Sequence, residues 1–282
     1  MGPATKKALK CAPILTFLLL LAVPSSFAQI EERIKTTVRI PLRAPEMTVQ
    51  DNAQPNEKSQ VKIRLLSGYD VELIVDSSLS MRKTDCPNGL SRWSWCGIQA
   101  EELGKRLSPY VPKGLTITAF ARNFNVYRNA TPANIADLFN NPNFRGGTRL
   151  AEPLDHRLNE FFERKKVGSK PLLIAVITDG VPHPQEEPDM VINTLINASN
   201  RMKNSRDVTV VFFQIGGRDR FGREFLNFLD HNLVKNGARY DFVKTVTFEH
   251  MIQVGLSQAL IESIEDFANS QKAPKSAPKQ KP

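Results

Sequence analysis

One carboxylate and two hydroxyls stand at alternate positions directly after a short apolar run. The run covers residues 71–75, and Asp76, Ser78 and Ser80 follow it in the pattern Asp-x-Ser-x-Ser. In a loop that leaves a strand, residues two apart can point the same way, so these three oxygens can converge. Hard oxygen ligands without a thiol or an imidazole suit a hard divalent cation, Mg²⁺ first and Mn²⁺ or Ca²⁺ as alternatives.

Two further segments carry oxygen-bearing side chains at predicted loop positions. Asp179 and Gly180 directly follow the apolar run PLLIAVIT, which is typical of a fully buried strand. Gly146 and Gly147 mark a loop that ends in Thr148. Thr148 can serve as a cation ligand, as the N-cap of the helix that follows it, or as both.

The elements that must position these residues alternate along the chain between apolar runs and helical periodicity. Strands are expected at 71–75, 115–121, 123–128, 171–178, 207–215 and 240–243, and helices at 97–110, 131–139, 150–165, 188–203, 221–235 and 248–266. This alternation predicts an α/β fold: a doubly wound, mostly parallel sheet with helices on both faces. The tight turn before residues 123–128 makes that strand antiparallel. Ligands bind at the carboxyl ends of such strands, where both Asp76 and Asp179 are expected.

The three segments together resemble the von Willebrand factor A (VWA) domain family. The resemblance rests on DSSLS at 76–80, GGT at 146–148 and TDG at 178–180, and it covers residues 67–266. It implies a Rossmann-like fold with one antiparallel edge strand and a metal-ion-dependent adhesion site. In that site Ser78 and Ser80 would bind the cation directly, whereas Asp76, Thr148 and Asp179 would act directly or through water.

The expected chemistry is recognition of an acid through the cation. A site built largely of neutral hydroxyls leaves the charge of Mg²⁺ under-neutralised, so a carboxylate from a partner protein would complete its ligand shell. We therefore expect a non-enzymatic binding protein. The alternative is a metal-assisted phosphoester hydrolase at the same edge of the sheet. That alternative needs a second carboxylate close to Asp76, where the sequence has Ser77 and Ser78.

The first 28 residues have the three parts of a secretory signal peptide. Three lysines within residues 6–10 precede an apolar run over 11–23, and Ser26-Phe-Ala28 supplies small residues for cleavage near Ala28. The apolar run is short for a bilayer span, although an uncleaved anchor is the alternative. The expected address is secreted or periplasmic, without stable membrane insertion after cleavage.

The segments that flank residues 67–266 carry less information. Residues 29–66 are an N-terminal extension in which 51–60 is polar and linker-like, and alternation over 38–42 and 61–65 allows short edge strands. Residues 267–282 form a Lys- and Pro-rich tail that is expected to be disordered. The net charge of +9 lies largely in this tail and in the signal segment, so no nucleic-acid partner is expected.

The loop after the Asp-x-Ser-x-Ser motif contains the remaining candidates. An even pair of cysteines in an exported chain suggests a disulfide between Cys86 and Cys96, with two free thiols as the alternative. Trp93 and Trp95 are either an exposed partner contact or a packed hydrophobic lid. With Gly147 and His183, these tryptophans are candidates for the rim of the ligand surface.

Overall fold

Six strands form one sheet in the order β3-β2-β1-β4-β5-β6. The computed structural model describes residues 57–216 and 219–270, so the predictions for residues 1–28, 29–56 and 271–282 lie outside it. The strands are β1 (Asp70–Asp76), β2 (Leu115–Phe120), β3 (Phe124–Ala130), β4 (Leu172–Thr178), β5 (Val208–Gln214) and β6 (Val243–Val246). All neighbours pair in parallel except β2 and β3, which are antiparallel.

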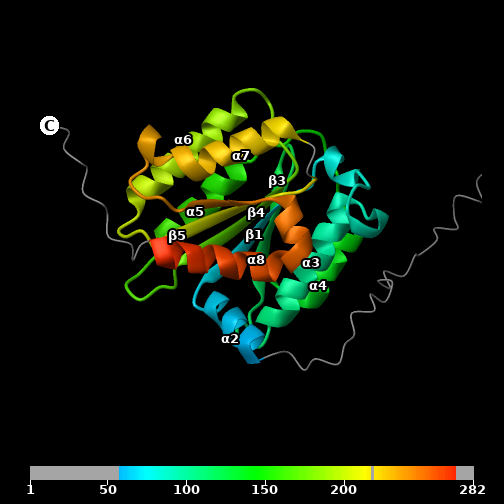
Figure 1. Ribbon diagram of the computed structural model, residues 1–282, viewed down its shortest axis with the longest axis horizontal. Helices are drawn as coiled ribbons and strands as arrows, with labels where there is room; N and C mark the ends of the chain where they lie inside the picture. The colour runs from blue at the N-terminus through cyan, green and yellow to red at the C-terminus, as the bar shows by residue number, and fades with distance from the viewer. Residues whose placement is uncertain (1–56, 217–218, 271–282) are drawn as a thin grey trace, which may run out of the picture. The chain divides into compact units, whose positions relative to one another are not determined.

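Helices cover both faces of the sheet because side chains along each buried strand alternate between two apolar clusters (Figure 1). Leu73 and Val75 of β1 face one cluster, whereas Ile74 faces the other. The first cluster contains α2 (Glu57–Leu66), α3 (Arg92–Leu107), α4 (Pro132–Asn140) and α8 (Phe248–Ser270). The second contains α5 (Ala151–Arg164), α6 (Glu187–Arg201) and α7 (Arg220–Asn232). The predicted α/β fold, with one antiparallel edge strand, is confirmed.

Several element boundaries differ from the sequence prediction, and local hydrogen bonds account for two of them. Helix α3 begins at Arg92 rather than near residue 97, because the Ser91 side chain caps it by accepting from the backbone N–H of Ser94. The last strand covers 243–246 rather than 240–243, because the backbone N–H of Tyr240 donates to the Ser199 hydroxyl instead of a neighbouring strand. Helix α8 continues to Ser270, past the predicted end at 266.

The edge strand expected over residues 61–65 is wrong, because this segment lies within helix α2. Ile63 and Leu66 are buried three positions apart, which is helical spacing, while Leu65 is exposed. The side chain of Lys62 also donates to Glu265 of α8, 3.2 Å away. The packed core therefore begins before residue 67.

One ion pair lies inside the second apolar cluster. Arg157 of α5 is 1% exposed, and its Nε and Nη2 donate to the two carboxylate oxygens of Glu72 on β1, at 2.7 and 2.9 Å. Arg157 Nη1 also donates to Glu160, and Arg164 Nη2 donates to Glu72 at 3.2 Å. This bidentate contact gives the guanidinium of Arg157 and the carboxylate of Glu72 hydrogen-bond partners, which offsets much of the free energy lost when the two charges leave water.

The sheet order changes direction between β1 and β4, because the chain adds β2 and β3 on one side and β5 and β6 on the other. Such a switch point opens a crevice at the carboxyl ends of the two strands. Asp76 is the last residue of β1, and Asp179 directly follows β4. Among the described residues, no helix combines the length and apolar composition needed to cross a bilayer.

Candidate metal centre

Hydrogen bonds link two hydroxyls and a carboxylate into one chain at this crevice. Ser78 Oγ and Ser80 Oγ are 2.8 Å apart, and Ser80 Oγ donates to Asp179 Oδ1 at 2.9 Å. Since a hydroxyl has one proton and Ser80 uses its own toward Asp179, Ser78 is the donor to Ser80. Segments 99 positions apart in the sequence thus place three oxygens in consecutive contact.

Asp76 lies beneath this series of hydrogen bonds and is fully buried. Its Oδ1 accepts from the backbone N–H of Ser78 at 2.7 Å, and its Oδ2 accepts from Thr178 Oγ1 at 3.0 Å. Burial raises the pKa of Asp76 to about 7, the charge of Asp179 adds to the shift, and hydrogen bonds from Ser78 and Thr178 oppose it. Asp76 therefore fixes the direction of the Asp-x-Ser-x-Ser loop.

The loop that contains Thr148 reaches the same edge of the sheet. The backbones of Thr148 and His183 exchange two hydrogen bonds, of 3.3 and 3.0 Å, so His183 is fixed beside Thr148 with an exposed side chain. Gly147 precedes them with φ of 90°, a conformation that a side chain would strain. Helix α5 starts at Ala151 without a side-chain cap, so Thr148 does not serve as its N-cap.

A buried guanidinium lies beside the carboxylate of Asp179. Arg92 is 5% exposed, and its Nη1 donates to Asp179 Oδ2 at 2.7 Å. Its Nε and Nη2 donate to the two oxygens of Asp85, at 2.8 and 2.5 Å. These bonds raise the pKa of Arg92 and lower that of Asp85, so both remain charged. A Cβ on Gly216 would overlap this guanidinium, so only glycine leaves room for it.

The site opens into a cleft of about 910 Å³. Its walls combine both signs of charge with apolar side chains: Ser80, Lys83, Arg92, Thr148, Asp179, Gly180, Val181, Asp219, Phe221 and Phe225. Phe221 is 73% exposed at the start of α7. The carboxylate of Asp219 caps the same helix by accepting from the backbone N–H of Phe221 at 3.1 Å. The cleft thus offers a partner both polar and apolar contacts.

The spacing of the oxygens fits a small octahedral cation. Magnesium–oxygen bonds are about 2.0–2.1 Å, so adjacent ligands of an octahedral ion lie about 2.8–3.0 Å apart. Ser78, Ser80 and Asp179 already have consecutive oxygens at 2.8 and 2.9 Å. Within the described part of the chain, no three His, Cys, Asp or Glu side chains form a metal-binding group, so a cation here would depend on hydroxyls.

Neither tryptophan lies on the rim, contrary to the first of the two alternatives. Trp93 donates from Nε1 to the carbonyl of Phe139 at 2.9 Å, and its ring centroid lies 4.5 Å from that of Phe139. Trp95 packs edge-on against Phe248 at 5.4 Å. Both indoles are buried, so they form a packed hydrophobic layer between α3 and its neighbours.

The two cysteines are buried free thiols, so the expected disulfide is not formed in the structure. Burial raises the pKa of Cys86 to about 11 and that of Cys96 well above its usual value, which keeps both thiols protonated. The loop is instead held by the Arg92–Asp85 ion pair and by a hydrogen bond of 2.9 Å from the backbone N–H of Arg92 to the carbonyl of Lys83.

Arg92, Asp85 and Thr178 are site residues that the sequence interpretation missed. Nothing in the sequence connects Arg92 to Asp179, which lies 87 positions later. Thr178 could have been found, because it ends the strand directly before Asp179.

No protein-family model matches the chain, and no curated protein matches it. Similar solved structures include an aerotolerance-related membrane protein from Bacteroides fragilis, with 15% identity and a TM-score of 0.46 over 70% of this chain and 99% of that one. The pilus adhesin SpaC from Lactobacillus rhamnosus GG has 11% identity and a TM-score of 0.42, over 72% of this chain and 30% of the adhesin. Manganese-loaded TRAP from Plasmodium vivax has 17% identity and a TM-score of 0.41, over 68% of this chain and 71% of that one.

Proposed function

We propose that the chain is a VWA-type binding protein that recognises an acidic group of a protein partner through a divalent cation. The observation that supports this function best is the run of oxygens from Ser78 through Ser80 to Asp179, spaced as adjacent magnesium ligands. Thr148 lines the same cleft and supplies a further hydroxyl. Asp76, with both oxygens already hydrogen-bonded, orients the loop from behind.

A bound cation would supply a positive charge that attracts a carboxylate. The chain's own groups decide how much of that charge remains for the partner. Arg92 already neutralises part of the charge of Asp179, and the two serine hydroxyls are neutral. Under-neutralised Mg²⁺ favours an additional anionic ligand, which the open cleft admits.

The geometry favours a binding protein over a phosphoester hydrolase. A nucleophilic carboxylate must reach its substrate, whereas Asp76 is fully buried and accepts hydrogen bonds at both oxygens. Asp179 is bonded to Ser80 and Arg92 in the same way. We expect no Mg²⁺-dependent turnover of p-nitrophenyl phosphate. Turnover by the wild type that disappears in Ser80→Ala would instead support the hydrolase function.

Calorimetric titration of the full chain with Mg²⁺ and Mn²⁺ tests the cation site. Loss of one ligand should weaken binding about tenfold or more in Ser80→Ala and in Asp179→Asn. Ser108→Ala is the matched control, because Ser108 is exposed and bonds only the carbonyl of Lys105. Wild-type protein that binds neither ion would contradict the proposal.

Capture of the partner is a separate experiment. Immobilised wild-type protein should retain a protein from the native secretome in Mg²⁺ and release it in EDTA, whereas Ser80→Ala should not retain it. Retention that is equal in Mg²⁺ and EDTA would leave the cation site intact but remove its role in recognition.

We also propose that the chain is exported by the signal peptide predicted over residues 1–28. N-terminal sequencing of the exported protein should then begin near Gln29, one residue after the small-residue pair of the cleavage motif. An exported chain that keeps its first 28 residues would favour the uncleaved anchor.

A further inference from the structure

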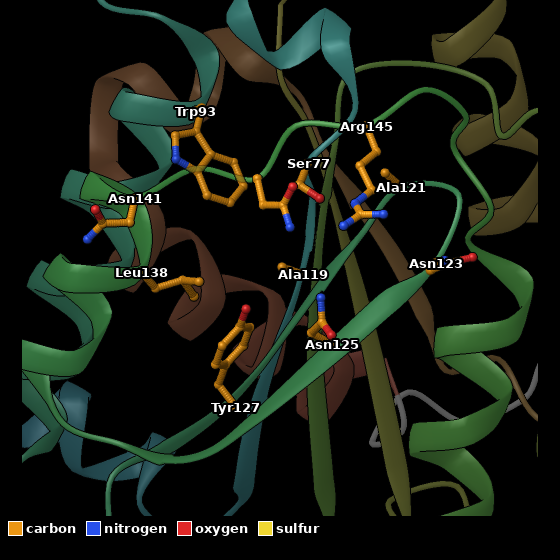
Figure 2. Close-up of a pocket in the computed structure, with 11 residues that line it drawn as sticks. Ser77, Trp93, Ala119, Ala121, Asn123, Asn125, Tyr127, Leu138, Asn141 and Arg145 are labelled. Carbon is orange, nitrogen blue, oxygen red and sulfur yellow. The ribbon is translucent and has the colours of Figure 1, made fainter.

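A second polar cavity, of about 120 Å³, lies on the other side of the β1 terminus from the candidate metal centre. Residues from β2, β3, α3, α4 and the loops line it: Ser77, Trp93, Ala119, Ala121, Asn123, Asn125, Tyr127, Leu138, Asn141, Asn143 and Arg145. Figure 2 shows the guanidinium of Arg145, the amide of Asn125 and the hydroxyl of Tyr127 directed into the same space. These groups come from a loop and from edge strand β3.

The lining has one charged group, and that charge is positive. Arg145 is the only ionisable residue among the lining residues that carries a charge at neutral pH, and no Asp or Glu is among them. The arginine contributes five N–H donors, each asparagine amide two and the tyrosine one O–H. This composition attracts an anion and repels a cation.

Three of these donor groups have no partner among the described residues. Across residues 57–216 and 219–270, the side chains of Arg145, Asn125 and Tyr127 take part in no hydrogen bond or ion pair, and all three are exposed, so water occupies their donors until a ligand replaces it. By contrast, the two buried arginines, Arg92 and Arg157, are each held by two carboxylates. The guanidinium of Arg145, the amide of Asn125 and the hydroxyl of Tyr127 are therefore available to a ligand.

The walls of the cavity are fixed by contacts that do not use these donors. The backbone N–H of Arg145 donates to the carbonyl of Ser77 at 3.3 Å, and Arg145 forms a β-bridge with Ser78. The amide of Asn141 donates to the carbonyl of Asp137 at 2.9 Å, and Trp93 is buried against Phe139. The walls are therefore in place before a ligand binds, and only the exposed donor side chains must be ordered by it, which limits the entropy lost on binding.

The size of the cavity narrows the class of ligand. Since one water occupies about 30 Å³ of liquid, the cavity holds the equivalent of about four waters. Pockets that enclose drug-sized ligands measure about 300 Å³ or more, so this cavity would enclose only part of a nucleotide or an oligosaccharide. A carboxylate with its adjoining methylene fits this volume, and its two oxygens match the fork of an arginine.

We propose that this cavity binds a carboxylate, through Arg145 together with the amide of Asn125 and the hydroxyl of Tyr127. The carboxylate comes either from an acidic side chain of a protein or from a small free acid. The site needs no cation, so it stands independently of the proposed metal centre.

The experiment is a titration of the full chain in EDTA, followed by the NMR shifts of side-chain amide and guanidinium N–H groups. The probes are acetate, N-acetyl-aspartate amide, the isosteric N-acetyl-asparagine amide, and glycerol as a neutral molecule of similar size. We expect millimolar binding of both carboxylates and no saturable shift with the two neutral probes. Tighter binding of the blocked aspartate points to a protein side chain, and tighter binding of acetate points to a free acid.

Three variants test the assignment of the donors. Arg145→Gln should weaken carboxylate binding about tenfold or more, and Tyr127→Phe should weaken it several-fold. Arg122→Gln is the matched control, since it removes the same charge from an exposed position that does not line the cavity. Equal binding of the aspartate and asparagine probes, or unchanged binding in a folded Arg145→Gln protein, would overturn the proposal.

The two proposals can fail separately. Carboxylate binding that appears only when Mg²⁺ is added, and that Ser80→Ala abolishes, would place the acid on the cation and overturn the cavity proposal. Binding in EDTA that is lost in Arg145→Gln supports the cavity site, whatever the calorimetry of the metal centre shows.

Discussion

Replacing Arg92 by methionine should destabilise the protein, and divalent cations should reverse much of the loss. Arg92 is buried, and it is a charged partner of Asp179, to which it donates at 2.7 Å. Methionine keeps much of the length of the side chain but removes the charge. Asp179 would then lie buried beside Asp76 without its ion-pair partner.

The magnitude follows from the burial of each partner. Removing one member of a buried ion pair costs about 3–5 kcal/mol, because the remaining charge is left uncompensated. The side chain of Asp85 is 37% exposed and can be hydrated when Arg92 is gone, so its share of the cost is small. We therefore expect a loss of about 3 kcal/mol, which for a domain of this size lowers Tm by about 6–12 °C.

The cation should stabilise the variant more than the wild type. A ligand at 100 times its Kd adds about 2.7 kcal/mol to the free energy of unfolding. In the variant, the cation meets no competing guanidinium at Asp179, so its affinity should rise and its stabilisation with it.

Urea denaturation of the full chain, in EDTA and in saturating Mg²⁺, measures both effects. Asp85→Asn is the control, since it keeps the Arg92–Asp179 pair and should cost less than half as much. A variant within about 0.5 kcal/mol of wild type in EDTA would refute the stabilising role of Arg92. A large loss that Mg²⁺ does not reverse would instead count against the cation site.

Three further outcomes follow from the same structure. Gly147→Ala should lower stability by about 1 kcal/mol or more, because φ is 90° there, and should weaken Mn²⁺ binding by calorimetry; Gly146→Ala, which meets nothing within 4 Å, should do neither. Arg157→Met should cost about 3–5 kcal/mol in urea denaturation, and adding Glu72→Met should recover part of the loss. Burial acts to raise the pKa of Glu160, but hydrogen bonds from two arginines outweigh it and lower the pKa to about 2. Its stabilisation should therefore persist above pH 4.5 and disappear as the pH falls toward 2, and acid denaturation of Glu160→Gln should lack this component.

The sequence predicts the architecture well because strands that are buried on both faces of the sheet are apolar runs, which are recognisable in the sequence. The runs that became β4 and β5 are largely apolar, as are four of the five residues 71–75 in β1, and helical periodicity between these runs predicted helices on both faces. Prediction failed where a local contact outweighed the pattern. The alternation over residues 61–65 suggested a strand, yet Ile63 and Leu66 pack on one side of a helix.

Some residues of the candidate site could be predicted from the sequence, whereas others depend on tertiary contacts. Asp76 and Asp179 were predictable as neighbours because the carboxyl ends of parallel strands share an edge of the sheet. Arg92 was not, because its position depends on where α3 begins and on the space that Gly216 leaves. Trp93 and Trp95 illustrate a different limit: the sequence placed them in a loop of unknown orientation, whereas they lie in the first turn of α3 and both are buried.

The ion pair between Glu72 and Arg157 constrains how β1 can be threaded into the sheet. A slip of one residue would turn Glu72 to the opposite face, and a slip of two would carry it about 7 Å along the strand, beyond the reach of Arg157. In either shifted register, a charged side chain would be left unpaired within an apolar layer. The same displacement would separate Asp76 from Thr178, its hydrogen-bond partner on β4. A glutamate four residues upstream of Asp76 thereby sets the height at which that aspartate meets the neighbouring strand.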